Sequence, residues 1–389
     1  APVKAEDKGA ENIEEAFTKG KLDLEFRLGY EMSDLEDNGA KKAHGLNLRS
    51  RIGFRTAELA GISAYAQVHN NWNLDKSFND NTGDNTQRDV IADPEETRLH
   101  QAYVDLNLIP DTLIRIGRQE IILDNARFVG NIGWRQNGQS FDAVTVVNNS
   151  FEDLTLTGSF VKDIQTILGT EAHLEHLAVL HARYKASEKQ NYSLFTYLLD
   201  TEDSSRDSVT IGARADGQLE NVVYDFTVAS QSDYSSGSGH DSRMLNSYVG
   251  LKEEKFSDGL GYDYFSGADN AGDKGFDTLV GTAHKFNGWS DQFLGTNGGK
   301  VTDGLQDLYV QASTKIEKTK LLARIHNYEA TERSAGTYGQ EYEVVAKRPF
   351  KINDEHKVTV LAKAALFKAD EAGSGKDETV FWLRAIYKY

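Results

Sequence analysis

The chain has no cysteine and only 4 prolines in 389 residues. Without cysteine, no disulfide can hold the fold, so its stability must come from packing and hydrogen bonds alone. No Ser/Pro-rich or Gly/Ser-rich tract of linker length is present, so nothing divides the chain into the two or three soluble domains that its length suggests. These absences favour one large, continuous, hydrogen-bonded unit.

Long apolar runs are also missing. No segment approaches the ~20 consecutive apolar residues of a membrane helix, and the mean hydropathy is −0.54. Low average hydropathy does not exclude a membrane barrel, because its lipid-facing and lumen-facing residues alternate and cancel. The 34 glycines, 17 tyrosines and 18 phenylalanines suit a β-rich chain with aromatic girdles.

Signatures of other function classes are absent from the sequence. The net charge of −17 argues against a nucleic-acid-binding protein, which usually carries a basic patch. No G-x-S-x-G, H-E-x-x-H or P-loop motif occurs, so we expect no enzymatic activity. The chain starts APVKAEDK without a basic and apolar leader, as a mature form with its signal peptide removed would.

Alternation of apolar and polar residues with a period of two recurs along the chain and predicts strands with one apolar face. The expected lipid-facing residues include Phe26, Leu48, Phe54, Leu106, Phe226, Val310 and Leu383. The predicted strands cover 21–32, 44–56, 60–72, 97–108, 112–118, 141–148, 153–162, 175–186, 190–200, 208–216, 219–231, 243–252, 259–267, 304–316, 319–329, 338–348, 356–368 and 378–389.

Short and long connections alternate between these strands, which is typical of an outer-membrane barrel with short periplasmic turns and long extracellular loops. We therefore predict an all-β antiparallel transmembrane barrel of about 18 strands over 21–389, with residues 1–20 as a periplasmic segment. Residues 11–18 form either a short helix in a loose tail or, less favoured, a periplasmic plug. A soluble sandwich or propeller is disfavoured, since no repeat of 40–50 residues is found.

The face opposite the apolar one carries many cations. Strand phase places these side chains in the lumen: Arg27, Arg49, Arg51, Arg55, Arg115, Arg214, Arg324, Lys363 and Arg384. Rings of Arg and Lys favour anions in a pore. The alternative is charge balance, because Asp23, Glu25, Asp105, Asp225 and Asp307 share the same face.

Two blocks of sequence point to a family. Residues 262–295 read YDYFSGADNAGDKGFDTLVGTAHKFNGWSDQFLG, and residues 117–144 read GRQEIILDNARFVGNIGWRQNGQSFDAV. Both resemble the alginate-export family of outer-membrane porins. The C-terminal Tyr389 departs mildly from the Phe with which most of the family ends.

The resemblance implies that residues 119–140 line the pore near its constriction, where Arg118, Arg127 and Arg135 would add to the basic lumen. The alternative is an extracellular cap packed by Phe128 and Trp134. In the second long loop, 268–303, Asp269, Asp273 and Asp277 are oxygen ligands suited to Ca²⁺. Their spacing is not that of an EF-hand loop, so a solvated acidic loop is the favoured explanation, and we expect no other cofactor.

These observations predict an outer-membrane diffusion channel, a porin, that passes anionic solutes. The resemblance implies alginate or uronate oligosaccharides, whereas a general neutral-solute porin and a non-conducting adhesin or structural barrel remain alternatives. Its expected surroundings are outer-membrane lipid and lipopolysaccharide, with no nucleic acid. The oligomeric state is open, and a monomer is favoured.

Overall fold

The computed structural model describes residues 9–268, 273–294, 303–331, 336–353, 356–370 and 375–389. One short helix, α1 (Ile13–Thr18), precedes 18 strands. The strands are β1 (Lys21–Leu35), β2 (Ala43–Arg55), β3 (Ile62–Ser77), β4 (Glu96–Ile109), β5 (Thr112–Gln119), β6 (Ser140–Phe151), β7 (Leu154–Gln165), β8 (Glu171–Ser187), β9 (Gln190–Thr201), β10 (Ser208–Leu219), β11 (Val222–Asp233), β12 (Asp241–Lys252), β13 (Phe256–Phe265), β14 (Leu305–Ile316), β15 (Thr319–Glu329), β16 (Thr337–Lys351), β17 (Lys357–Ala369) and β18 (Glu378–Lys388). Among the described residues, no helix is both long and apolar enough to cross a membrane.

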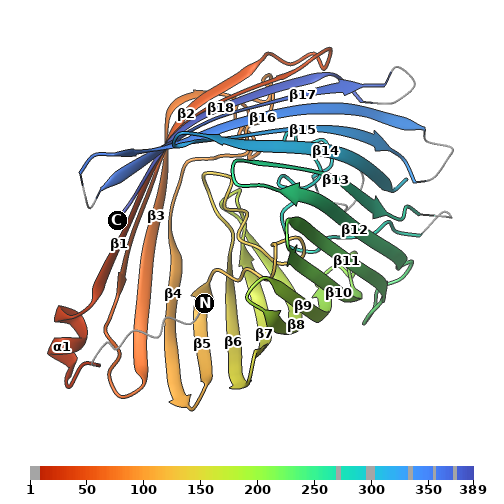
Figure 1. The fold of residues 1–389 in the computed structure, drawn as a ribbon. Helices are drawn as coiled ribbons and strands as arrows, with labels where there is room; N and C mark the ends of the chain where they lie inside the picture. The colour runs from red at the N-terminus through yellow and green to blue at the C-terminus, as the bar shows by residue number, and fades with distance from the viewer. Residues whose placement is uncertain (1–8, 269–272, 295–302, 332–335, 354–355, 371–374) are drawn as a thin grey trace.

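Each strand pairs antiparallel with its sequence neighbours, and β18 pairs with β1 to close the ring (Figure 1). Closure leaves no unpaired edge, which is what a strand-built structure needs in hydrocarbon. The predicted closed antiparallel barrel of 18 strands is therefore confirmed. The fold has short turns at the end where β1 begins and β18 ends, and long loops at the other end.

The observed strand ends differ from the predicted ones by a few residues. The largest difference in a turn concerns Gly217 and Gln218, which were expected to connect two strands. They instead continue β10 and pair with Tyr224 and Val223, and the turn follows at Glu220 and Asn221. Glycine is required at this position because the backbone of Lys189 lies very close: a Cβ at Gly217 would be 2.4 Å from the Lys189 carbonyl oxygen.

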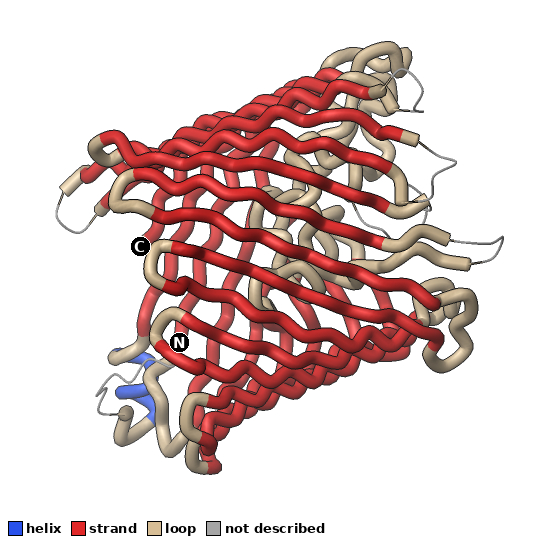
Figure 2. Tube along the Cα trace, turned by 45° about the vertical axis from the view of Figure 1, so that its right-hand side comes forward, coloured by secondary structure: helices blue, strands red, loops and turns tan. Residues whose placement is uncertain are grey.

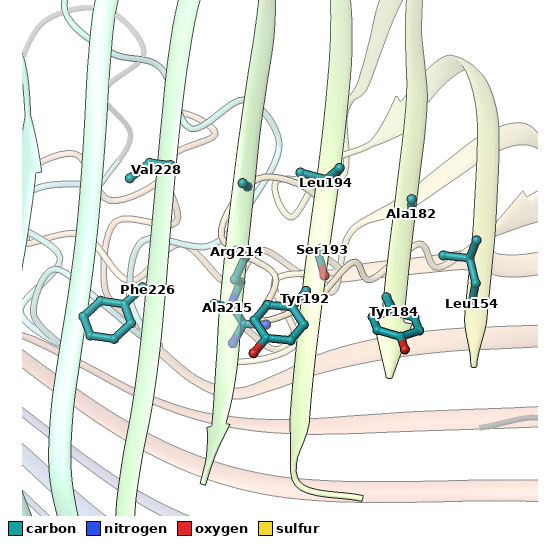
Figure 3. A pocket seen from close by; sticks show the side chains of 11 residues that line it. Leu154, Ala182, Tyr184, Tyr192, Ser193, Leu194, Arg214, Ala215, Phe226 and Val228 are labelled. Atoms are coloured by element: carbon teal, nitrogen blue, oxygen red, sulfur yellow. The ribbon is translucent and has the colours of Figure 1, made fainter. Parts of the chain in front are cut away.

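The outer wall is apolar and exposed, as expected for a surface in contact with lipid. Phe226 is 40% exposed and Leu383 is 46% exposed. A shallow groove of about 440 Å³ on this wall is lined by apolar side chains such as Leu194 and Phe226 (Figure 3). Ser193 also borders the groove, but its hydroxyl donates to Asp124 at 2.8 Å, inside the barrel.

Candidate pore constriction

Two long connections fold into the barrel rather than over it. They are residues 120–139, between β5 and β6, and the described parts of 266–304, between β13 and β14; loop segments run inside the ring of strands (Figure 2). The two connections pair with each other through a bridge between Val129 and Val280. Gln139 Nε2 also donates to the Val280 carbonyl at 2.8 Å. Together they form one folded insert within the lumen.

The 120–139 segment crosses the lumen from wall to wall. Near one end, the Asp124 carboxylate accepts from His181 and Arg183 of β8, at 2.8 and 2.6 Å. Near the other end, the Gly133 carbonyl accepts from Arg27 of β1 at 3.1 Å. In a ring of 18 strands, β1 stands far across from β8 and β9, so the segment spans the lumen.

Apolar side chains fasten the insert to the inner wall. Phe128 packs against Phe195 of β9 in a tilted arrangement with ring centroids 5.1 Å apart, and its ring centroid lies 6.1 Å from that of Phe276 in the second connection. Val129 and Leu177 are fully buried in the same cluster. This part of the inner wall is apolar, whereas strand alternation alone predicts a polar lumen face. Its apolar residues pack against the insert.

Arg135 ties the insert to the mouth of the barrel. Its guanidinium donates to Glu31 of β1 at 3.0 Å and to Asp93 of the β3–β4 loop at 3.2 and 2.9 Å. The Arg135 carbonyl accepts from Arg27 and Arg49 at 3.3 Å each. A cavity of about 410 Å³, lined by Glu31, Asp89 and Arg135 among others, adjoins this contact.

Three of the four tryptophans surround Lys363 of β17. Its ammonium lies 3.8 Å from the ring centroid of Trp134, 3.9 Å from that of Trp289 and 4.8 Å from that of Trp382. Lys363 also lies 2.6 Å from Nε2 of His284, whose Nδ1 is 2.6 Å from Asp291. Burial, followed by the charges of Lys363, Arg135 and Arg384, holds the pKa of His284 well below its usual range. A neutral His284 thus accepts from Lys363 and donates to Asp291.

Two partly buried carboxylates at the start of the insert, Glu120 and Asp124, stay ionised because of their partners on the wall. Burial alone would raise the pKa of Glu120, but the hydrogen bond with His100 and the charge of Arg51 lower it to about 2. Burial likewise opposes ionisation of Asp124, and the hydrogen bond with His181 outweighs it, so that its pKa falls to about 2. Hydrogen bonds and charges from the wall therefore stabilise the ionised carboxylates at the start of the 120–139 segment.

Most predicted lumen cations are paired with carboxylates. Arg49 pairs with Glu25, and Arg51 lies 3.2 Å from Glu120. The other pairs are Arg55 and Arg115 with Asp105, Arg127 with Asp263, Arg214 with Asp225, Arg324 with Glu343, and Arg384 with Glu31 at 3.7 Å. The two arginines of the 120–139 segment are thus inside the barrel, and both are paired with carboxylates from other parts of the chain: Arg127 with Asp263 of β13, and Arg135 with Glu31 and Asp93.

Arg118 departs from its predicted position in the pore. It shares strand parity with Ile116, which is 47% exposed on the outer wall. Its guanidinium pairs with Asp142 at 2.6 Å and lies 3.3 Å from Glu171. The segment turns inward only after β5 ends at Gln119, so residue 118 keeps the outward phase of its strand.

Sequence reasoning missed several cations that contact the insert, among them Arg183 and Lys285. Arg183 was not assigned to the lumen because Leu177 and Val179, on the same face of β8, are apolar and resemble a lipid-facing stripe. Lys285 belongs to the family-like block, but only the inward fold of that block brings it beside Asn125, whose carbonyl accepts from its ammonium at 3.2 Å. Arg324 donates to the Lys285 carbonyl at 3.3 Å.

The candidate calcium ligands are not gathered in the part of the chain that the structure describes. Asp277 accepts from Arg206 at 2.7 and 3.1 Å. Within the described ranges, no group of three or more His, Asp or Glu side chains is arranged to hold a metal ion. Asp269 lies outside the described residues, and Asp273 lies near the start of a described stretch.

Comparison with solved structures supports the porin fold. The chain matches a structure of Pseudomonas aeruginosa OpdK with vanillate at 14% identity, covering 96% of this chain and 99% of that one, with a TM-score of 0.74. P. aeruginosa OccK9 (OpdG) also matches at 14% identity, with coverage of 96% and 100% and a TM-score of 0.73. Acinetobacter baumannii OccAB4 matches at 12% identity, with coverage of 99% and 100% and a TM-score of 0.71.

No curated protein matches the sequence. The profile of the family described as Alginate export matches residues 22–297, which is more than half of the chain and includes the whole 120–139 connection and the first part of the second connection. With a closed barrel of 18 strands and a folded insert between its walls, the chain belongs to the alginate export family of outer-membrane porin-like channels.

Proposed function

We propose that this chain is a passive outer-membrane channel that prefers anionic solutes, with uronate oligosaccharides as the class suggested by its family. The proposal depends mainly on the position of Lys285, whose ammonium has no carboxylate partner among the described residues. Its side chain is exposed although it lies within the barrel. Partial desolvation lowers the pKa of Lys285, the charge of Asp225 raises it, and the charges of Arg127, Arg214 and Arg324 lower it. Among the described residues, no carboxylate lies within ion-pair distance of its ammonium.

The Lys285 ammonium donates to the Asn125 carbonyl but has no carboxylate partner among the described residues. Such an uncompensated positive charge raises the local concentration of carboxylate solutes and repels cations. The effect is strongest at low ionic strength, because salt screens exposed charges over about 10 Å at 0.1 M. Catalysis has no part in this proposal. The channel selects by electrostatics and by the width that the insert leaves open.

The second candidate is a channel for neutral solutes. The pairing of most wall arginines with carboxylates favours it, since paired charges of opposite sign contribute little net potential to the pore. The two candidates differ in one measurable quantity, the sign and size of the reversal potential in a salt gradient.

The test is the reversal potential of single channels in a KCl gradient, for the wild type and for Lys285→Glu. We expect the wild type to prefer chloride and the variant to shift toward potassium. Lys162→Glu makes the same charge change on a 55% exposed outer-face side chain and should leave selectivity unchanged. A wild type that prefers potassium, or equal reversal potentials for wild type and Lys285→Glu, would refute the anion preference.

A further inference from the structure

Helix α1 lies outside the barrel, at the rim of short turns. The Ala57 amide donates to the Ala16 carbonyl at 2.8 Å, and the Ala10 amide donates to the Glu58 carbonyl at 2.7 Å. These bonds dock the segment on the turn between β2 and β3, beside the start of β1 (Figures 1 and 2). It is therefore neither a loose tail nor a plug.

Two large apolar side chains of α1 are exposed. Ile13 is 71% exposed and Phe17 is 59% exposed. They are four residues apart, so they lie on one face of the helix. Leaving such residues in water is unfavourable, and their adjacency marks a surface that contacts something apolar.

The apolar face of α1 continues the lipid-facing wall. The Phe17 ring stacks on Phe54 of β2, with centroids 6.2 Å apart and planes 6° apart. Phe54 points outward on the same strand face as Ile52, which is 52% exposed. The surface formed by Ile13, Phe17 and Phe54 thus joins the belt that contacts lipid.

The remaining surface of the helix is charged. Glu14 is exposed, and Lys19 pairs with Glu15 at 2.7 Å. An amphipathic helix with an aromatic residue at its apolar face lies in the headgroup boundary of a bilayer. Because this charged face is mainly acidic, it suits zwitterionic phospholipid better than anionic phospholipid.

We propose that α1 is an interfacial anchor, with Ile13 and Phe17 inserted into the headgroup boundary of the periplasmic leaflet. The partner is therefore glycerophospholipid. The anchor fixes the depth of the barrel at the point where β1 enters the membrane. This role is independent of what the channel conducts.

The absence of native cysteine allows a clean test. Ile13→Cys, Phe17→Cys and, on the charged face, Glu14→Cys are each labelled with a nitroxide and reconstituted into vesicles of the zwitterionic lipids phosphatidylethanolamine and phosphatidylcholine. Electron paramagnetic resonance then measures collisions of the label with oxygen, which partitions into lipid, and with a water-soluble nickel chelate. We expect the oxygen-to-nickel ratio at positions 13 and 17 to exceed that at position 14 by about fivefold.

Two results would overturn the proposal. If nickel reaches positions 13 and 17 as readily as position 14, the apolar face lies in water. If both reagents are excluded from 13 and 17, protein rather than lipid covers that face. The Ile13→Cys variant keeps the Phe17–Phe54 stack. Its label therefore remains informative even if the Phe17→Cys variant loses that stack and disturbs the helix.

Discussion

Replacing Arg135 with Met should detach part of the insert from the barrel mouth. The side chain is buried between Glu31 and Asp93, and three of its N–H groups are used by these two carboxylates. Methionine replaces the aliphatic stem of arginine but is shorter and carries no charge. The substitution therefore leaves two buried carboxylates facing each other without their shared cation.

Removing one partner of a buried ion pair typically costs about 3–5 kcal/mol, because the remaining charge is uncompensated. The strand ladder does not depend on Arg135, so the cost falls on the docked state of the insert. A penalty of that size lowers the ratio of docked to released insert by a factor of about 10² to 10³ or more. Release at this end opens the space between the insert and β1.

Single-channel conductance in planar bilayers measures the opening. We expect Arg135→Met to have a higher and noisier conductance than the wild type, with unchanged heat-dependent migration of the folded barrel on a gel. Adding Glu31→Gln and Asp93→Asn should restore much of the wild-type conductance, since the neutral triad no longer carries a buried charge. Arg118→Met, a paired arginine on the outer wall, serves as the control.

Unchanged conductance in Arg135→Met would refute this reasoning. It would mean that the apolar cluster around Phe128 alone holds the insert in place. A variant that fails to fold at all would also contradict it, because the barrel would then depend on the insert. Recovery in the triple variant separates charge burial from loss of packing.

Three further predictions follow from the same contacts. Lys363→Met removes the ammonium from between three indoles, where a desolvated cation–π contact is worth about 2 kcal/mol. Quenching of tryptophan emission by iodide should increase, and unchanged quenching would contradict the packing of Trp134, Trp289 and Trp382 around Lys363. Phe226→Arg should lower barrel stability by roughly 2–4 kcal/mol in urea unfolding from vesicles, and an unchanged midpoint would place residue 226 off the lipid face. Since the pKa values of Glu120 and Asp124 are lowered to about 2, their stabilisation of the insert is complete above about pH 5 and is lost as the pH falls toward 2. Conductance should become noisier over that range, and steady conductance down to pH 2 would count against these pairs.

Much of the barrel could be predicted because its physics is local. Phe26, Leu48 and Phe226 face lipid, and alternation with a period of two fixes that phase from the sequence alone. The turn after β10 was placed too early because a glycine within a strand and a glycine in a turn look alike in a single sequence. Only the contact of Gly217 with the Lys189 backbone distinguishes them.

The constriction could be predicted only in part. Arg27, Arg49 and Arg384 have the right phase, but their bonds to carbonyls of 133–136 depend on where a distant loop folds. The inward position of Arg183 could not be predicted, because the other residues on the inner face of β8 are apolar and have the pattern of a lipid-facing stripe. Residues buried against an insert inside a barrel follow the rules of a soluble core, and alternation cannot tell which medium covers an apolar face.

An insert with its own hydrophobic core has a consequence for selectivity. Phe128, Val129 and Phe276 pack to the inner wall as a soluble core does, while Arg135 and Lys363 fix the far end by charge. A segment held at both walls keeps its width and its charged groups in place, so the channel discriminates without opening and closing a loop. Under the proposed anion preference, selectivity would depend on the few cations that the carboxylates leave uncompensated, and Lys285 is the residue whose charge should change it most.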